Sequence, residues 1–412
     1  MLNRWNKMFA AAALALALPV VANAQSSRVE GMDLQGDYIK DYTSIYSYPS
    51  SVSHVGNLVY GEFGGGADRG VGAVLGNLWE GRFGTWAIHL RQFEPSLGQA
   101  TTNSHPGIGT FGQDINANAN HSFDLMWGKR MGGTSVGLRI NRSFGELELS
   151  TPTVQTIVNP NLFPVFADSN TFARNVFGVG GGLGFEVNPS TQFEVGILWQ
   201  SRTFEVTQSP IGAATNQKDD SPTSYQLAAR LMWQWQPNVL VVPVFKWYSF
   251  DYSYKVTDAA GTITRDATQK GWQIGAAGNW TLNQNDLFVL GFTAARNTVE
   301  SDTDVFGLGA SKTEESIYPQ IFAALETHVN PWLTVRFGAT NDANVVQKFT
   351  AFGGAGELKD TFSNFDMQLG CGVKLGGLQF DAIMDPDFYN RITNVGSDSA
   401  PGFGKVTATY AF

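Results

Sequence analysis

The sequence predicts an all-β fold, a transmembrane antiparallel β-barrel of sixteen strands with an N-terminal plug or periplasmic segment. Runs of alternating apolar and polar residues recur from residue 54 to the end of the chain. Aromatic residues make up 13% of the chain and glycine occurs 46 times, while charged residues make up only 15%. The final run ends on Phe412. Barrels that cross membranes combine such alternation with aromatic girdles at both interfaces.

The first 24 residues have the features of a signal peptide. Arg4 and Lys7 precede an apolar run from Met8 to Val21, and Ala22-Asn23-Ala24 forms a small-residue cleavage site. The run is shorter than the ~20 residues that a membrane-spanning helix needs. We therefore expect residues 1–24 to direct export, and we expect no helical membrane anchor.

Composition excludes several classes of function. The formal charge of −9 and the absence of basic clusters argue against a nucleic-acid partner. The five histidines are scattered without metal-ligand spacing, and the G-x-S-x-G motif of a nucleophile elbow does not occur. The sequence thus predicts neither an enzyme nor a cofactor or metal site.

Residues 25–53 are rich in tyrosine and show no clear periodicity, so we expect them to pack into the barrel lumen or at its periplasmic mouth. Within them, Asp41-x-Thr43-x-Ile45-Tyr46-x-x-Pro49 resembles the N-terminal segment of the FadL-type outer-membrane transporters of long-chain fatty acids and hydrocarbons, and of PorV-like barrels. The resemblance implies a hatch that includes Asp41, Tyr46 and Pro49. It departs from the family at Tyr48-Pro49-Ser50, where Asn-Pro-Ala is expected.

The barrel itself is predicted over residues 54–412. In residues 191–204, Phe193 and Ile197 share one face, while Glu194 and Arg202 lie on the other. Charged residues on one face of a barrel strand indicate a wet interior. The sixteen runs lie near 54–63, 69–78, 83–92, 121–131, 134–145, 172–186, 191–204, 223–236, 239–252, 268–281, 286–300, 313–329, 332–341, 361–375, 378–389 and 404–412.

The first two runs are the least regular, because Val59, Tyr60, Val71 and Val74 do not sort onto one face. Fourteen strands are the alternative, which the FadL-type resemblance also implies. Short turns of Gly, Asn and Pro alternate with long polar stretches, as periplasmic turns and extracellular loops do in barrels. The long stretches are residues 94–120, 146–170, 205–222 and 342–360.

Charged residues at inward positions of these runs are candidates for the lining of a lumen. They either pair across neighbouring strands and fill the barrel, or form a constriction that selects solutes. The candidates are Arg91, Asp124, Arg130, Arg139, Glu194, Arg202, Arg230, Lys246, Glu326, Arg336, Asp366, Lys374 and Asp381.

A row of glycines occupies the inward side of one run, at Gly178, Gly180, Gly182 and Gly184. Its spacing does not match a phosphate-binding loop, and no helix follows. Such a row admits a bulky group from the lumen or permits strong curvature. We expect the plug, residues 36–49, to occupy that space.

The last eight residues alternate, with Val406, Tyr410 and Phe412 on one face. This end resembles the closing strand of Gram-negative outer-membrane barrels, which their assembly machinery recognises. The resemblance makes Tyr410 and Phe412 a C-terminal assembly signal and implies a location in the cell outer membrane. Its partners there would be membrane lipid, lipopolysaccharide and the barrel-assembly machinery.

These observations favour an outer-membrane channel or porin that passes small molecules by passive diffusion through a partly plugged lumen. A FadL-type transporter of hydrophobic substrates with an N-terminal hatch is the first alternative. A structural or adhesive surface barrel is the second. The sequence leaves open the solute and the oligomeric state.

Overall fold

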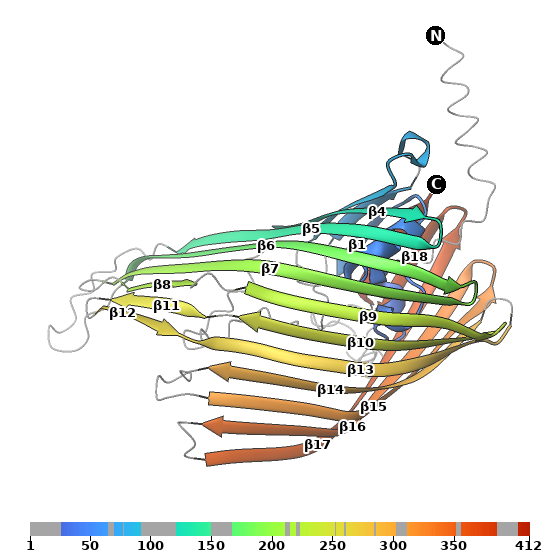
Figure 1. The fold of residues 1–412 in the computed structure, drawn as a ribbon. Helices are drawn as coiled ribbons and strands as arrows, with labels where there is room; N and C mark the ends of the chain where they lie inside the picture. The colour runs from blue at the N-terminus through green and yellow to red at the C-terminus, as the bar shows by residue number, and fades with distance from the viewer. Residues whose placement is uncertain are drawn as a thin grey trace, which may run out of the picture.

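The computed structural model describes residues 26–64, 70–76, 78–91, 121–149, 167–210, 215–219, 223–251, 253–258, 261–283, 286–301, 311–351, 356–384 and 403–412. The signal peptide predicted at 1–24 and the long stretch 94–120 lie outside these residues. Within them, sixteen antiparallel strands close into a barrel (Figure 1). No helix among these residues has the length and apolar character needed to cross a membrane.

The wall follows chain order around the barrel, and β1 pairs with β19 from Leu58 opposite Ala411 to Gly64 opposite Lys405. This pairing leaves the ring without a free edge. The wall strands are β1 (Leu58–Gly64), β2 (Gly70–Leu75), β3 (Thr85–Arg91), β4 (His121–Met131), β5 (Thr134–Leu149), β6 (Ala167–Asn188), β7 (Thr191–Pro210), β9 (Thr223–Gln236), β10 (Val239–Asp251), β13 (Ala267–Thr281), β14 (Leu287–Ser301), β15 (Ser311–Asn330), β16 (Leu333–Ala351), β17 (Gly356–Leu375), β18 (Leu378–Met384) and β19 (Phe403–Ala411).

The prediction of sixteen strands is confirmed, and the fourteen-strand alternative is wrong. The two irregular runs are β1 and β2, and both belong to the wall. Val59 and Val71 are exposed on the outer face, whereas Tyr60 and Val74 are buried inside. The inner face of these strands packs against protein and carries apolar residues beside the buried Glu62, which weakens the alternation in the sequence.

Several polar stretches predicted as long loops continue the strands instead. β16 and β17 remain paired as far as Ala351 opposite Gly356, so the prediction of a loop over 342–360 is wrong. β6 and β7 remain paired as far as Ala167 opposite Pro210, which shortens the loops predicted at 146–170 and 205–222. Three further strands extend the sheet beside β7: β8 (Thr215–Asp219), β11 (Tyr254–Asp258) and β12 (Gly261–Arg265). Polar residues on both faces suit strands that project beyond the lipid, where water wets both sides.

The opposite end of the barrel has tight turns. Gly132 and Gly376 adopt φ values of 63° and 65° in the β4–β5 and β17–β18 turns, a conformation that glycine accepts without strain. Figure 1 shows the long extensions of β5–β7 and β13–β17 at the end away from the C-terminus. We call the two ends the short-turn end and the long-strand end.

The two faces of the wall differ in character. Leu138, Ile197 and Phe292 are more than half exposed on the outer face, while Asp124 and Arg139 are fully buried inside. A soluble protein places such side chains the other way round. An apolar outer face on a closed sheet with a charged interior is the arrangement that lipid requires.

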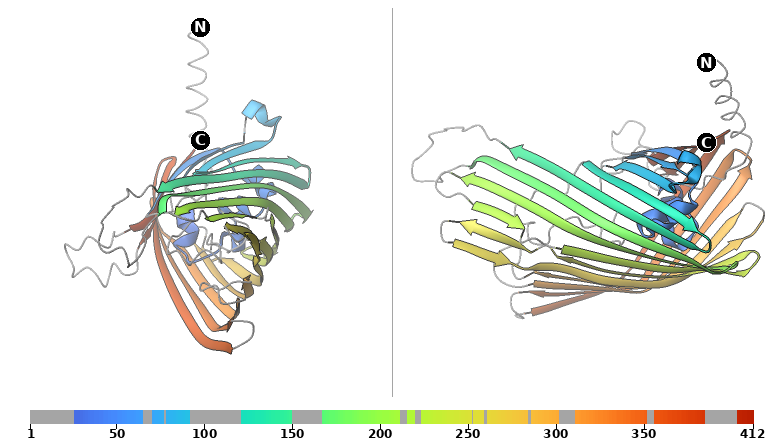
Figure 2. Two further views of the ribbon diagram at one scale, coloured as in Figure 1. Left: turned by 90° about the vertical axis from the view of Figure 1, so that its left-hand side faces the viewer. Right: turned by 45° about the horizontal axis from the view of Figure 1, so that its top comes forward.

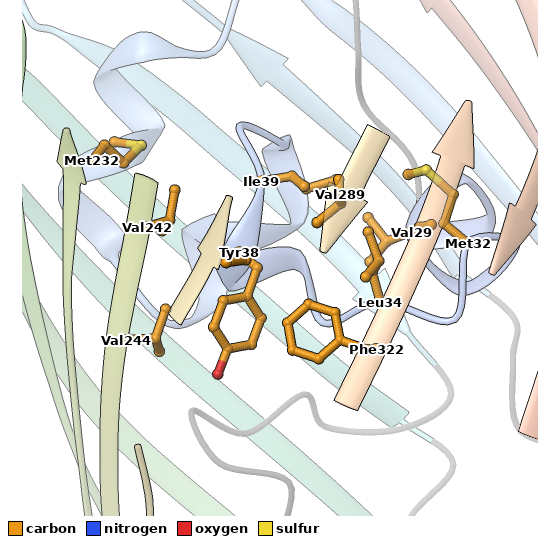
Figure 3. Packing of buried hydrophobic residues seen from close by; sticks show 12 residues of the cluster. Val29, Met32, Leu34, Tyr38, Ile39, Met232, Val242, Val244, Val289 and Phe322 are labelled. Carbon is orange, nitrogen blue, oxygen red and sulfur yellow. The ribbon is translucent and has the colours of Figure 1, made fainter. Parts of the chain in front are cut away.

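Residues 26–54, here called the plug, fold inside the barrel near its short-turn end (Figures 1 and 2). The plug consists of one short α-helix and three 3₁₀ turns: α2 (Ser26–Glu30), η1 (Gly36–Tyr38), η2 (Tyr42–Tyr46) and η3 (Pro49–His54). A further 3₁₀ turn, η4 (Leu78–Gly81), lies between β2 and β3. Apolar plug residues join wall residues in two buried clusters, one of which is shown in Figure 3.

Candidate functional site: the plug and the cavity beside it

Arg28 on helix α2 joins the plug to the wall. Its guanidinium donates from Nε and Nη2 to the two carboxylate oxygens of Glu326 on β15, each at 2.8 Å. Its Nη1 donates to Asp41 Oδ2 of the plug at 2.9 Å. Arg336 on β16 donates to the same Glu326 at 2.6 Å and also pairs with Asp381 on β18. Five charges thus form one buried chain from the plug across three wall strands.

Two more ion pairs join plug and wall at other points of the circumference. Lys246 on β10 pairs with Asp37 of η1, and both side chains are almost fully buried. Lys405 on β19 pairs with Glu30 at 2.8 Å. The Lys246–Asp37 pair is buried, and a buried pair repays its desolvation only when both partners are present, so it fixes the plug against β10. Glu30 is 45% exposed, so its pair with Lys405 adds a weaker attachment.

Two wall arginines bind plug backbone as well as wall carboxylates. Arg230 pairs with Glu194 at 2.6 Å and donates to the Asp37 carbonyl at 3.2 Å. Arg139 pairs with Asp124 at 2.7 Å and donates to the Tyr46 carbonyl at 3.2 Å. These side chains therefore satisfy carbonyls that the short 3₁₀ turns leave without a partner in regular structure.

Asp41 organises the plug from within. It is the N-cap of η2, where its Oδ1 accepts from the Thr43 N–H and the Thr43 hydroxyl, each at 2.9 Å. Burial raises the pKa of Asp41, although Arg28 and the Thr43 N–H act in the opposite direction. One carboxylate thus caps a turn and completes the ion-pair chain.

Aromatic side chains hold η2 against β1 and β3. The Tyr60 hydroxyl lies 2.9 Å from His89 Nδ1, and the Tyr46 hydroxyl contacts the same nitrogen. Tyr42 packs edge-on against Tyr60, with ring centroids 5.3 Å apart. His89 is fully buried in this group.

Glycines on the wall make room for plug backbone. A Cβ at Gly137 would overlap Pro49, one at Gly196 would overlap the Ser47 carbonyl, and one at Gly338 would overlap the Met32 carbonyl. In the predicted glycine row, Gly182 lies against Pro49 and Ser50. Gly178 and Gly180 instead face neighbouring wall side chains, so only part of the row serves the plug.

The predicted lining residues fall into three groups. Asp124, Arg139, Glu194, Arg230, Lys246, Glu326, Arg336 and Asp381 are buried inside and joined by the ion pairs above. Arg130 pairs with Glu186 at 2.6 Å near the short-turn end, where Lys374 is also exposed, and Asp366 lines a cavity described below. Arg91 and Arg202 lie on β3 and β7, but their side chains are outside the described part of the chain.

The other predicted residues lie in the plug and on the last strand. Asp41, Tyr46 and Pro49 are buried in the plug. The rings of Tyr410 and Phe412 stack with centroids 6.2 Å apart, and the Phe412 N–H donates to the Asn57 carbonyl at 3.2 Å.

Sequence reasoning missed the plug's own charges, Arg28 and Asp37, and the glycines that receive the plug. The plug lacks the periodicity that sorts side chains onto faces. Gly137, Gly196 and Gly338 do occupy inward positions of alternating runs, so their register is a signal that identifies them.

A cavity of about 430 Å³ lies between the plug and strands β15 to β18. That volume is within the range of small-molecule sites. The residues that line it are Glu30, Asp33, Leu34, Gln35 and Tyr38 from the plug, and Gln320, Phe322, Thr340, Asp342, Asn364, Asp366, Gln368 and Ile383 from the wall. Among the described residues, no group of three or more His, Cys, Asp or Glu side chains is placed to hold a metal ion.

Comparison with known proteins finds distant structural likenesses. A FadL homologue of Pseudomonas aeruginosa matches with a TM-score of 0.41 and 10% identity, over 93% of this chain and 97% of that one. The toluene transporter TbuX of Ralstonia pickettii gives 0.40 and 9%, over 95% and 99% of the two chains. The monoaromatic hydrocarbon channel CymD gives 0.41 and 12%, over 96% and 99%. No family model and no curated protein matches the sequence.

Proposed function

We propose that the protein is an outer-membrane transporter that receives a small, partly apolar solute in the cavity beside its plug. The apolar outer face of the closed barrel supports the outer membrane as its location. Passage of the solute then requires the plug to shift.

The observation that carries the proposal is the attachment of the plug around the wall. Arg28, Asp37 and Glu30 pair with β15, β10 and β19, and η3 packs against strands on the opposite side. An open porin does not need buried ion pairs that hold a plug inside its lumen. The attachment therefore favours a transporter with a hatch over passive diffusion through an open pore.

The lining of the cavity supports a solute with an apolar part. Leu34, Tyr38 and Phe322 line the cavity and also belong to the buried apolar cluster of Figure 3. Their side chains give the plug side of the cavity an apolar edge. A hydrophobic or amphiphilic solute fits this wall better than a fully hydrated ion.

Planar-bilayer conductance tests the proposal. The wild-type barrel should give little steady conductance, and deletion of residues 25–50 should open large, steady steps. A loosened full-length variant, Asp37→Asn, should give intermittent openings and serves as a check in case the deletion does not fold. The conservative change Glu314→Gln, far from the plug on β15, is the matched control. Large steady steps from the wild type would instead establish an open porin.

A further inference from the structure

The cavity beside the plug has an unbalanced charge. Its lining includes the four carboxylates of Glu30, Asp33, Asp342 and Asp366, and within the described part of the chain no Lys, Arg or His lines it. Glu30 is neutralised by Lys405 at 2.8 Å. The other three carboxylates line the cavity without a basic partner among the described residues.

The hydrogen bonds of the wall leave acceptors in excess. Gln320 accepts from the Thr293 hydroxyl at 2.8 Å and donates to Asp342 Oδ1 at 2.7 Å, so both ends of its amide are engaged. Asp366 Oδ1 accepts from the Met367 N–H at 2.8 Å. The second oxygen of each aspartate receives no hydrogen bond from the described residues. Carboxylate oxygens in the lining are therefore available to accept hydrogen bonds from a ligand, and the Asn364 and Gln368 amides are available to donate.

Two plug groups on the same cavity have unmet hydrogen-bonding capacity. Asp33 Oδ2 and the Tyr38 hydroxyl are buried and have no partner in the described part of the chain. Tyr38 is 1% exposed, and the Gln273 amide beside it donates to Gln35 at 3.0 Å. Asp33 has φ 49°, a conformation that is uncommon for residues other than glycine. Burial raises the pKa of Asp33, a hydrogen bond with the Thr340 side chain acts in the opposite direction, and the nearby Asp366 and Asp342 raise the pKa further.

We propose that the cavity recognises an organic cation, an ammonium group attached to an apolar body. The inference rests on the proposed function and names the class of its solute. The carboxylates accept from the ammonium group, while Leu34, Phe322 and Ile383 receive the apolar body. The ring centroids of Tyr38 and Phe322 lie 4.9 Å apart, and the two residues form an aromatic edge of the cavity (Figure 3). A cavity of about 430 Å³ is much larger than a single water or bare ion occupies.

Calorimetric titration of the full barrel in detergent tests this assignment with three probes of similar shape: phenethylammonium, phenethyl alcohol and hydrocinnamate. Phenethylammonium should bind at least about tenfold more tightly than the alcohol, because charge-assisted hydrogen bonds are stronger than neutral ones. Hydrocinnamate, repelled by the carboxylates, should not bind. Equal affinity for ammonium and alcohol would overturn the inference, as would binding of the carboxylate or no binding of any probe.

Variants locate the site. Asp366→Asn should weaken phenethylammonium binding about tenfold and leave alcohol binding unchanged, since it removes charge and little volume. Asp360→Asn, exposed on the same strand and outside the cavity, is the matched control and should bind as the wild type does. Unchanged ammonium affinity in Asp366→Asn would overturn the inference. Failure here leaves the bilayer conductance test of the plug unaffected, so the two proposals can fail separately.

Discussion

Arg28 and Glu326 face each other fork to fork, with two N–O distances of 2.8 Å between residues 298 positions apart in the chain. The plug supplies the cation and the wall supplies the anion. Because both side chains are almost fully buried, neither can exchange its partner for water while the plug is in place. The pair is therefore a sensitive point at which to disturb the plug.

Substitution of Arg28 by Met should loosen the plug without unfolding the barrel. Asp41 and Glu326 would each lose a buried partner, which costs on the order of 3–5 kcal/mol of docking free energy. Hydrogen exchange of plug amides, followed by mass spectrometry, should speed up. Arg296→Met, at an exposed pair with Glu314, should cost less than about 1 kcal/mol and serves as control. Unchanged exchange in Arg28→Met would show that the pair contributes nothing to docking.

A side chain at Gly137 should displace the plug. A Cβ there overlaps Pro49, and because backbone cannot rotate away as a flexible side chain does, Gly137→Val should force η3 from the wall. The measurement is bilayer conductance, which should rise. On the neighbouring strand, Gly181→Ala meets only the Gly137 carbonyl at 3.9 Å and should behave as wild type. Closed channels in Gly137→Val would mean that the plug repacks at low cost.

Exchanging the charges of Asp37 and Lys246 tests whether this ion pair attaches the plug to the wall at a second point. Asp37→Lys alone places two cations together in a buried site, and Lys246→Asp alone places two anions there. Each single variant should release the plug, while the double variant should recover much of the docking because the pair is restored with opposite polarity. Protease cleavage within residues 26–54 provides the readout. Additive effects in the double variant would contradict direct coupling.

Asp286 should make the β13–β14 turn sensitive to acid. Its carboxylate accepts from the His328 N–H, the Asn283 amide and the Thr327 hydroxyl, each at 3.0 Å, and these bonds lower its pKa from 3.8. A lowered pKa in the folded state means that the stabilisation is complete above the ordinary value and disappears as the pH falls through the lowered one. The difference in unfolding temperature between wild type and Asp286→Ala should therefore narrow below about pH 4. A difference that stays constant from pH 6 to 3 would exclude this role.

The wall strands could be predicted because apolar and polar residues alternate with a period of two along each of them. Phe193 and Ile197 face outward and Glu194 faces inward, as their alternation predicts, and the charge of Glu194 marks the inner side. The alternation did not predict strands correctly where the two faces of a strand carry similar residues. β1 and β2 carry apolar residues on the inner face as well as the outer one, and the far ends of β16 and β17 carry polar residues on both faces.

For the plug, the sequence predicted only that the segment packs into the lumen or at the periplasmic mouth, and not which wall residues it contacts. Its residues pair with partners far along the chain, 298 positions away for Arg28 and Glu326 and 380 for Ser27 and Thr407. No local pattern encodes such distances. The cavity was not foreseen for the same reason, since Asp33 and Asp366 become neighbours only when the plug lies inside the closed wall.

Between the last residue of η3, His54, and the first residue of β1, Leu58, there are just three residues. Three extended residues reach roughly 10 Å, so a very short linker tethers the plug to the first strand of the wall. The plug therefore cannot diffuse away when its ion pairs break. Its effective concentration near its binding site in the barrel stays high, which favours prompt reclosure after each opening.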